Sequence, residues 1–361
     1  MMNSVTFIFP HIALGPTGGY KVVYEYANRL VNDGVVVHIV YSGSVYWKQK
    51  PLRFKLSNVV RYLQTLMRGY SAREWFPLDK RVKEHLTLSM NYRHVPKTDV
   101  YVATSPYTAW YLNDYPVADS KKFYFIQGKE DWGPGIKAIL EDTYHMPLRK
   151  IAVARWLQNM IANNYGEECV FIPNGFDFEK FRLTILPENK NKYSISVLYH
   201  TQELKRCADA IAALKIVKQQ IPALQVNVFG VPNRPEDLPD WFIYYQAPDS
   251  ETHNRINNES AIYIGSSITE GWCLTVGEAM ICGQAVCCTD IDGYTEMAHD
   301  GETALLSPIL NPEVLAKNII TLIEDDELRI KIAYKGNEFI QQFRWEASYR
   351  KFYNQLFSDK Q

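Results

Sequence analysis

The alternation of apolar and polar positions predicts strands and helices in regular succession. Short apolar runs at residues 5–9, 35–41 and 261–265 have the length and β-branched content of buried strands. Between such runs, apolar residues recur at helical spacing. The first helix is predicted from Val22, Val23, Tyr26, Ala27 and Leu30, and it ends at Asp33 and Gly34. This succession is typical of an α/β protein with parallel sheets.

The pattern occurs twice along the chain. The stretch 183–194 is polar, contains proline and has no periodicity, so we interpret it as a linker. A second series of strands and helices begins at residue 196. A length of 361 residues allows two domains with separate cores. We therefore expect an amino-terminal domain over residues 1–185 and a second domain over residues 186–339.

The composition is that of an ordinary soluble globular protein. Hydrophobic residues make up 47% of the chain, charged residues make up 22%, and the formal net charge is -1, so nothing favours a nucleic-acid partner. The first residues resemble a strand more than a signal peptide, and no apolar run has the length of a membrane span. The six cysteines follow no metal-ligand spacing. We expect reduced thiols and a cytoplasmic protein.

Residues 47–75 differ from the rest in charge. This segment has seven basic residues and one acidic residue, Glu74, and its apolar residues recur at helical spacing. It is predicted to form a basic amphipathic helix or helix pair. Two interpretations stay open: a helix packed on the sheet with a solvated basic face, or a peripheral contact with the inner face of the cytoplasmic membrane or with an acceptor that carries phosphate.

Two stretches carry candidate chemistry. Gly18 and Gly19 precede the first helix, where free amides favour phosphate, although a tight turn without a ligand is the alternative. Glu270 and Glu278 are separated by seven residues, in the order strand, loop, helix, with the helix running from about Thr275 to Gly283. Two carboxylates at the carboxyl edge of a parallel sheet are suited to paired hydroxyl groups of a sugar.

The stretch 266–296 resembles the signature of family 4 glycosyltransferases, which are retaining enzymes of the two-domain GT-B fold. The matching residues are Glu270, Gly271, Glu278, Ala279, Met280, Gly283, Gly293 and Glu296. A second match is the segment with Pro173, Asn174, Gly175, Asp177 and Phe181. The resemblance is strong from Ser194 to Phe343 and looser before it.

The resemblance implies two Rossmann-like domains facing a cleft, with the helix at 340–361 packing back on the first domain. It also implies transfer of a sugar from a nucleoside-diphosphate sugar to a glycan or lipid-linked acceptor, as in surface polysaccharide biosynthesis. The donor is a substrate, and no cofactor is expected. Asp290 and Asp292 form a D-x-D pattern, but they lie in the loop that leads to Glu296, so no metal is expected either.

The resemblance also assigns roles to residues. Glu278 is expected to bind the ribose, Glu270 the donor sugar, and Lys205 the diphosphate, so that Lys205 and Glu270 are the catalytic pair. The full donor-binding set is Gly18, Gly19, His200, Lys205, Arg206, Glu270, Gly271, Trp272, Cys273, Leu274, Thr275 and Glu278. The residues assigned to the acceptor side are Gln127, Glu130 and Asp131.

One departure concerns the phosphate-binding residues. Lys205 matches the family's lysine, but His200 stands where an arginine is expected, and Arg206 stands where a glycine usually follows. Either His200 is held protonated or Arg206 supplies the second positive charge. This departure keeps open a catalytically silent protein that binds sugar nucleotides. A nucleotide-sugar epimerase of the same fold is a further alternative.

Overall fold

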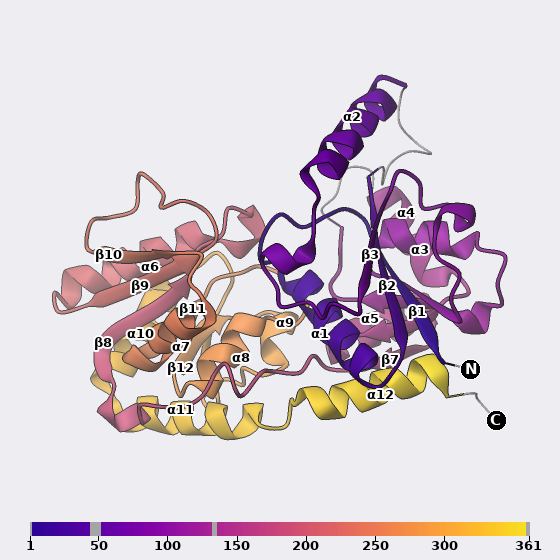
Figure 1. The fold of residues 1–361 in the computed structure, drawn as a ribbon. Coiled ribbons are helices and arrows are strands. Elements are labelled where there is room, and N and C mark those ends of the chain that lie inside the picture. The colour runs from indigo at the N-terminus through magenta and orange to yellow at the C-terminus, as the bar shows by residue number, and fades with distance from the viewer. Residues whose placement is uncertain (1, 44–51, 132–135, 359–361) are drawn as a thin grey trace. The chain divides into compact units, whose positions relative to one another are not determined.

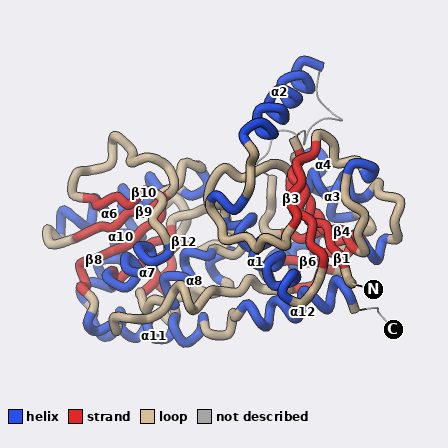
Figure 2. Tube along the Cα trace, viewed as in Figure 1, coloured by secondary structure: helices blue, strands red, loops and turns tan. Residues whose placement is uncertain are grey.

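The structure is a computed structural model that describes residues 2–43, 52–131 and 136–358. The chain forms two compact units. The first comprises Met1–Pro173 and Glu346–Gln361, and the second comprises Asn174–Trp345. Each unit contains one parallel β-sheet with helices packed beside it (Figures 1 and 2).

The first unit has seven strands in the order β3-β2-β1-β4-β5-β6-β7. The strands are β1 (Ser4–Phe9), β2 (Val36–Ser42), β3 (Lys83–Thr87), β4 (Val100–Ala103), β5 (Lys122–Ile126), β6 (Arg149–Ala152) and β7 (Cys169–Phe171). The helices are α1 (Gly18–Asn32), α2 (Leu52–Arg68), α3 (Pro106–Asn113), α4 (Lys137–His145) and α5 (Arg155–Tyr165), together with the carboxyl-terminal helix α12 (Trp345–Phe357).

Helix α12 belongs to the core of the first unit. The ring of Phe352 is fully buried and stacks on Tyr26 of α1, with ring centroids 4.1 Å apart. It also contacts the rings of Phe7 and Phe125, which come from β1 and β5. The last helix of the chain therefore completes a core that begins with the first strand.

The second unit has six strands in the order β10-β9-β8-β11-β12-β13. The strands are β8 (Asn191–Leu198), β9 (Gln225–Gly230), β10 (Phe242–Gln246), β11 (Ser260–Gly265), β12 (Ala285–Thr289) and β13 (Ala304–Ser307). The helices are α6 (Cys207–Gln220), α7 (Ser250–Glu259), α8 (Leu274–Ile281), α9 (Asp292–Thr295), α10 (Pro312–Glu324) and α11 (Asp326–Ile340). Its aliphatic core includes Ile195, Leu214, Val226 and Ile262.

The strand order gives each sheet one switch point. In the first unit, the chain runs outward from β1 to β3 and then returns to β4 on the other side of β1. In the second unit it runs outward from β8 to β10 and then returns to β11. Ligands of open α/β sheets bind outside the carboxyl ends of the two strands at such a point. The loops after β1 and β4, and those after β8 and β11, are therefore the places to look for sites.

The boundary between the units differs from the one expected at residues 185 and 186. Residues from Asn174 onward already belong to the second unit. The ring of Phe176 lies so close to α8 that a Cβ at Gly277 would be 2.1 Å from it. The Phe176 amide also donates to the carbonyl of Phe343 (2.9 Å).

The polar stretch 183–194 does not join the two units, because it lies within the second unit and residues 191–194 belong to β8. The buried Lys190 ammonium donates to the carbonyls of Asn257, Ser260 and Cys282 at 2.9, 3.2 and 2.7 Å. Burial lowers the pKa of Lys190 to about 7. Sequence polarity did not distinguish a linker from a segment whose polar side chain bonds buried carbonyls.

The basic segment at 47–75 forms α2 followed by a 3₁₀ turn at Ala72–Glu74. Residues 47–51 lie outside the described residues. Within the described ranges, none of the helices combines the length and the hydropathy needed to cross a bilayer.

Candidate functional site

The catalytic pair expected from the sequence lies at the switch point of the second unit. Lys205 follows β8, and Glu270 follows the neighbouring strand β11. Two hydrogen bonds join these loops: the Ile268 amide donates to the Leu204 carbonyl (2.9 Å), and the Ser266 hydroxyl donates to the Lys205 carbonyl (3.0 Å). The two loops therefore form one structural element at the carboxyl edge of the sheet.

The side chains of Lys205 and Glu270 form an ion pair. Nζ of Lys205 lies 2.6 Å from Oε1 of Glu270, and the side chains are 23% and 11% exposed. The Ser267 hydroxyl donates to the same carboxylate oxygen at 2.7 Å. Burial by itself would lower the pKa of Lys205, but the facing Glu270 carboxylate outweighs it and leaves that pKa raised. Lys205 is therefore charged at neutral pH, and its charge is already partnered.

Two residues outside the predicted site fix the position of Glu270. A Cβ at Gly293 would lie 2.2 Å from the Glu270 carbonyl oxygen, so only glycine permits this close approach. The Tyr294 hydroxyl accepts from the Ser267 amide at 3.3 Å. Gly293 belongs to the sequence signature, whereas no sequence signal pointed to Ser267 or Tyr294, because neither belongs to the motif.

Glu278 lies on α8, which begins directly after the loop of Glu270. Its side chain is buried, and it is one turn into the helix. Cys273, the residue before the helix, has a φ of 55°, a left-handed conformation that is rare for a residue with a side chain, and it makes no side-chain cap. The N-cap residue thus makes no side-chain cap, and a helix N-terminus of this kind favours an anion.

The other residues predicted to bind the donor in this loop are Gly271, Trp272, Leu274 and Thr275. Trp272 is buried against Phe343, with ring centroids 4.9 Å apart, so it packs in the core of the second unit. The Thr275 hydroxyl accepts a hydrogen bond from Tyr263 at 2.7 Å. Gly271 and Leu274 lie beside them in the chain and contribute backbone.

The sequence left two explanations for the missing arginine: a protonated His200, or a second positive charge from Arg206. The Gln202 amide donates to Nδ1 of His200 at 3.0 Å, so the ring proton of the neutral form is on Nε2. Burial, and then the nearby Lys205 charge, lower the pKa of His200. His200 is therefore neutral at pH 7. The guanidinium of Arg206 forms two hydrogen bonds with Asp209, at 2.8 and 2.9 Å, so it too is already paired.

The remaining predicted residues lie in the first unit. Gly18 and Gly19 follow β1, at its switch point, whereas Gln127, Glu130 and Asp131 follow β5, the strand next to β4. Gly19 packs against Gln127, whose side-chain amide donates to the Gly19 carbonyl at 3.1 Å. Thr17 caps α1 without a side-chain hydrogen bond, so the amide of Gly18 lies at an open helix end. The hydrogen bond from Gln127 to Gly19 joins the loops after β1 and β5.

Glu130 and Asp131 follow Gln127 in the loop after β5. Burial raises the pKa of Glu130 to about 8, so this carboxyl is protonated at neutral pH. Asp131 lies 3.8 Å from the ammonium of Lys129 and is more than one third exposed. Among the described residues, no group of three or more His, Cys, Asp or Glu side chains is arranged to hold a metal ion.

The comparisons with known proteins concern the family and the fold. Residues 178–339 match the family described as glycosyl transferases group 1, and this part of the chain is a domain of that family. A phosphatidyl-myo-inositol mannosyltransferase of Mycolicibacterium smegmatis is 23% identical over 221 residues, which are 58% of this chain and 57% of that protein. The chain thus spans little more than half the length of this relative.

Solved structures resemble the whole chain. HepE of Anabaena, crystallised with UDP and glucose, has a TM-score of 0.74 and 15% identity, with 99% of this chain and 100% of that chain covered. Sucrose-phosphate synthase of Thermosynechococcus elongatus has a TM-score of 0.70 and 15% identity, with 99% of each chain covered. Together with the two parallel sheets, these neighbours confirm the predicted GT-B fold.

We predict that Glu130→Gln changes the pH dependence of stability. Folded Glu130 has a pKa of about 8, whereas the unfolded group has its ordinary pKa of 4.5. The unfolded state therefore binds fewer protons, and this carboxyl makes the folded state less stable as pH rises through that window. Urea unfolding at several pH values should show that the variant gains stability over the wild type as pH rises. If the free energy of unfolding changes equally with pH in the variant and in the wild type, a raised pKa at Glu130 is excluded.

Proposed function

We propose that the chain is a retaining glycosyltransferase that moves a sugar from a nucleoside-diphosphate sugar to a glycan or lipid-linked acceptor. The observation that carries the proposal is the Lys205–Glu270 pair at the switch point of a group 1 glycosyl transferase domain. This site offers one cation for a diphosphate and one carboxylate for sugar hydroxyls, 2.6 Å apart. HepE, a structural neighbour, was crystallised with UDP-glucose.

The donor roles follow from the position of each group. The Lys205 ammonium binds the diphosphate, assisted by the open amides at the start of α8 and by the Nε2–H of neutral His200. Glu270 accepts hydrogen bonds from the sugar hydroxyls, and Glu278 accepts those of the ribose. Arg206 remains with Asp209, so its guanidinium is not the replacement for the missing arginine.

The proposed chemistry keeps the configuration at the anomeric carbon. The bond from this carbon to the phosphate oxygen breaks, the acceptor oxygen bonds the same face, and the acceptor proton passes to the departing phosphate. Lys205 stabilises the negative charge that develops on the phosphate as the bond lengthens. Glu270 and Glu278 both bind hydroxyl groups in this proposal, so neither acts as a covalent nucleophile.

The acceptor is assigned to the first unit. Gln127 and the protonated Glu130 follow β5 at the carboxyl edge of its sheet. A protonated carboxyl donates one hydrogen bond and accepts others, which suits a hydroxyl group. The names of the relatives include a mannosyltransferase of phosphatidyl-myo-inositol, which favours an acceptor that carries lipid or sugar. We connect this with the biosynthesis of surface polysaccharide.

Helix α2 supports a peripheral contact with an anionic membrane. Its second half exposes four apolar side chains, with exposed fractions from 49% to 79%: Val60, Leu63, Leu66 and Met67. The helix sequence contains four basic residues and no acidic residue. In Figure 1, α2 extends from the other elements of the first unit. Apolar side chains and cations on one helix suit the interface of a bilayer with anionic lipids.

The proposed function is tested by a thermal-shift screen with UDP, GDP, dTDP and ADP and their common sugar conjugates, with and without a divalent metal. A ligand at a hundred times its dissociation constant adds about 2.7 kcal/mol of stability. We expect a metal-independent shift with one nucleotide. Product analysis then separates sugar transfer from epimerisation. No shift with any nucleotide would refute the donor site, and binding without turnover would indicate a silent protein.

We predict opposite effects of two substitutions on binding of the nucleotide that the screen selects. Glu278→Ala weakens binding by about tenfold, because one charged hydrogen bond to the ribose is lost. Glu270→Gln strengthens binding of the free nucleoside diphosphate, because Lys205 no longer has a carboxylate partner, yet it slows turnover of the sugar conjugate. Calorimetry and steady-state kinetics measure the two effects. Weaker diphosphate binding by Glu270→Gln would contradict the pairing argument.

We predict that the protein co-sediments with vesicles of phosphatidylcholine and phosphatidylglycerol, and less with phosphatidylcholine alone or at high salt. Leu63→Glu and Met67→Glu should reduce the bound fraction. Ile243→Glu is the matched control, because Ile243 is 52% exposed on β10 of the second unit. Equal sedimentation of the three variants would rule out α2 as the contact.

A further inference from the structure

The loop between β1 and α1 is fixed by hydrogen bonds from two sides. We call this loop together with the first two residues of α1, residues 10–19, the glycine loop. On one side, the Tyr20 hydroxyl donates to the His11 carbonyl at 2.7 Å. On the other, Tyr70 and Trp75 both donate to the Ala13 carbonyl, the hydroxyl at 2.9 Å and the indole N–H at 3.0 Å. Ala13 is only 6% exposed, so its carbonyl depends on these donors.

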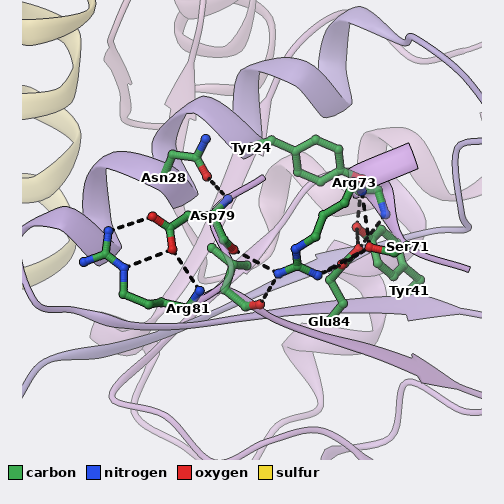
Figure 3. Close-up of polar contacts among 10 residues, drawn as sticks. Tyr24, Asn28, Tyr41, Ser71, Arg73, Asp79, Arg81 and Glu84 are labelled. Atoms are coloured by element: carbon green, nitrogen blue, oxygen red, sulfur yellow. Dashed lines mark hydrogen bonds and ion pairs between the residues drawn. The ribbon is translucent and has the colours of Figure 1, made fainter. Parts of the chain in front are cut away.

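Residues 71–73, which lie between Tyr70 and Trp75, are held by Glu84 of β3, whose side chain is 10% exposed; Figure 3 shows Glu84 with Ser71 and Arg73. The Glu84 carboxylate accepts from the Tyr41 hydroxyl (3.2 Å), the Ser71 hydroxyl (2.6 Å) and the Ala72 amide (2.8 Å), and it pairs with Arg73. A buried carboxylate with several donors constrains all of them. Residues 71–73 therefore have one position relative to the sheet.

The rest of this segment is fixed to α1 by Asn28. The side-chain amide donates to the Pro77 carbonyl at 3.0 Å, and its oxygen accepts from the Asp79 amide at 2.8 Å. Arg73 also donates to the Asp79 carbonyl at 2.9 Å, so it joins this contact to Glu84 (Figure 3). Tyr70 and Trp75 thus extend from a segment that is fixed at both ends.

Aromatic contacts also hold Tyr70 and Trp75. Tyr70 packs edge-on against Tyr41, with centroids 5.3 Å apart, and Trp75 contacts Tyr24 at 5.5 Å. Only Gly69 separates Tyr70 from the end of α2. The same short segment therefore follows the exposed basic helix and contacts the glycine loop.

We propose that Tyr70 and Trp75 are positioning residues that set the conformation of the glycine loop through the Ala13 carbonyl. They touch neither Gly18 nor Gly19, but they fix the backbone that leads to the open amides of α1. The expected effect of these residues on kcat/KM rests on the proposed function. The structural part of the proposal, the order of the loop, is measured independently of activity.

The test compares Tyr70→Phe, Trp75→Phe and the double variant with Tyr115→Phe. Each phenylalanine keeps an aromatic ring and removes one donor. Tyr115 is the matched control, because its buried hydroxyl also donates to a carbonyl, that of Met90, at 2.7 Å, away from the glycine loop. Hydrogen exchange is measured over residues 11–19, and kcat and KM are measured with UDP-glucose or with the conjugate that the thermal screen selects.

We expect exchange in the glycine loop to rise by about threefold to tenfold for each lost donor, with the largest effect in the double variant. The same variants should lower kcat/KM by a similar factor, and Tyr115→Phe should change neither quantity. Unchanged loop exchange in the double variant would overturn the proposal, and so would faster exchange with unchanged kcat/KM. If the wild-type protein shows no turnover, only the proposed function fails. Hydrogen exchange in the double variant still decides whether Tyr70 and Trp75 position the loop.

Discussion

The second unit depends on one electrostatic constraint, the pairing of Lys205 with Glu270. Neither side chain is freely solvated, and a partly buried charge is tolerated when an opposite charge and hydrogen bonds compensate its lost hydration. This pairing requires that the loops after β8 and β11 meet. The backbone bond from Ile268 to Leu204 and the close approach of Gly293 to Glu270 fulfil that requirement.

The pair also determines how much positive charge the site offers. Arg206 is paired with Asp209, and burial keeps His200 neutral. In the proposed function, a diphosphate bound here interacts with the Lys205 ammonium, a neutral imidazole and backbone amides. This site supplies less positive charge than an arginine and a lysine together, so the proposal makes the replacement of Glu270 by phosphate at Lys205 the central event of donor binding.

The two units have the same kind of sheet but fix their loops by different means. In the second unit, charges and glycine contacts position the loop that holds Glu270. In the first unit, aromatic side chains with hydroxyl or indole donors hold the glycine loop, and one buried carboxylate, Glu84, holds the segment that provides them.

The sequence by itself determined the α/β class and the motif that contains Glu270 and Glu278, because strand and helix periodicity and motif spacing are local properties of the chain. The GT-B fold was predicted from the resemblance of that motif to a known glycosyltransferase signature. The sequence did not determine the change of units at Asn174, since the contacts of Phe176 with Gly277 and Phe343 join residues far apart in sequence. Only the tertiary structure decided that Arg206 is paired, that His200 is neutral and that Lys190 bonds buried carbonyls. It likewise brought Tyr70 and Trp75 to Ala13. Each of these outcomes depends on burial and on partners from distant parts of the chain, which no local pattern encodes.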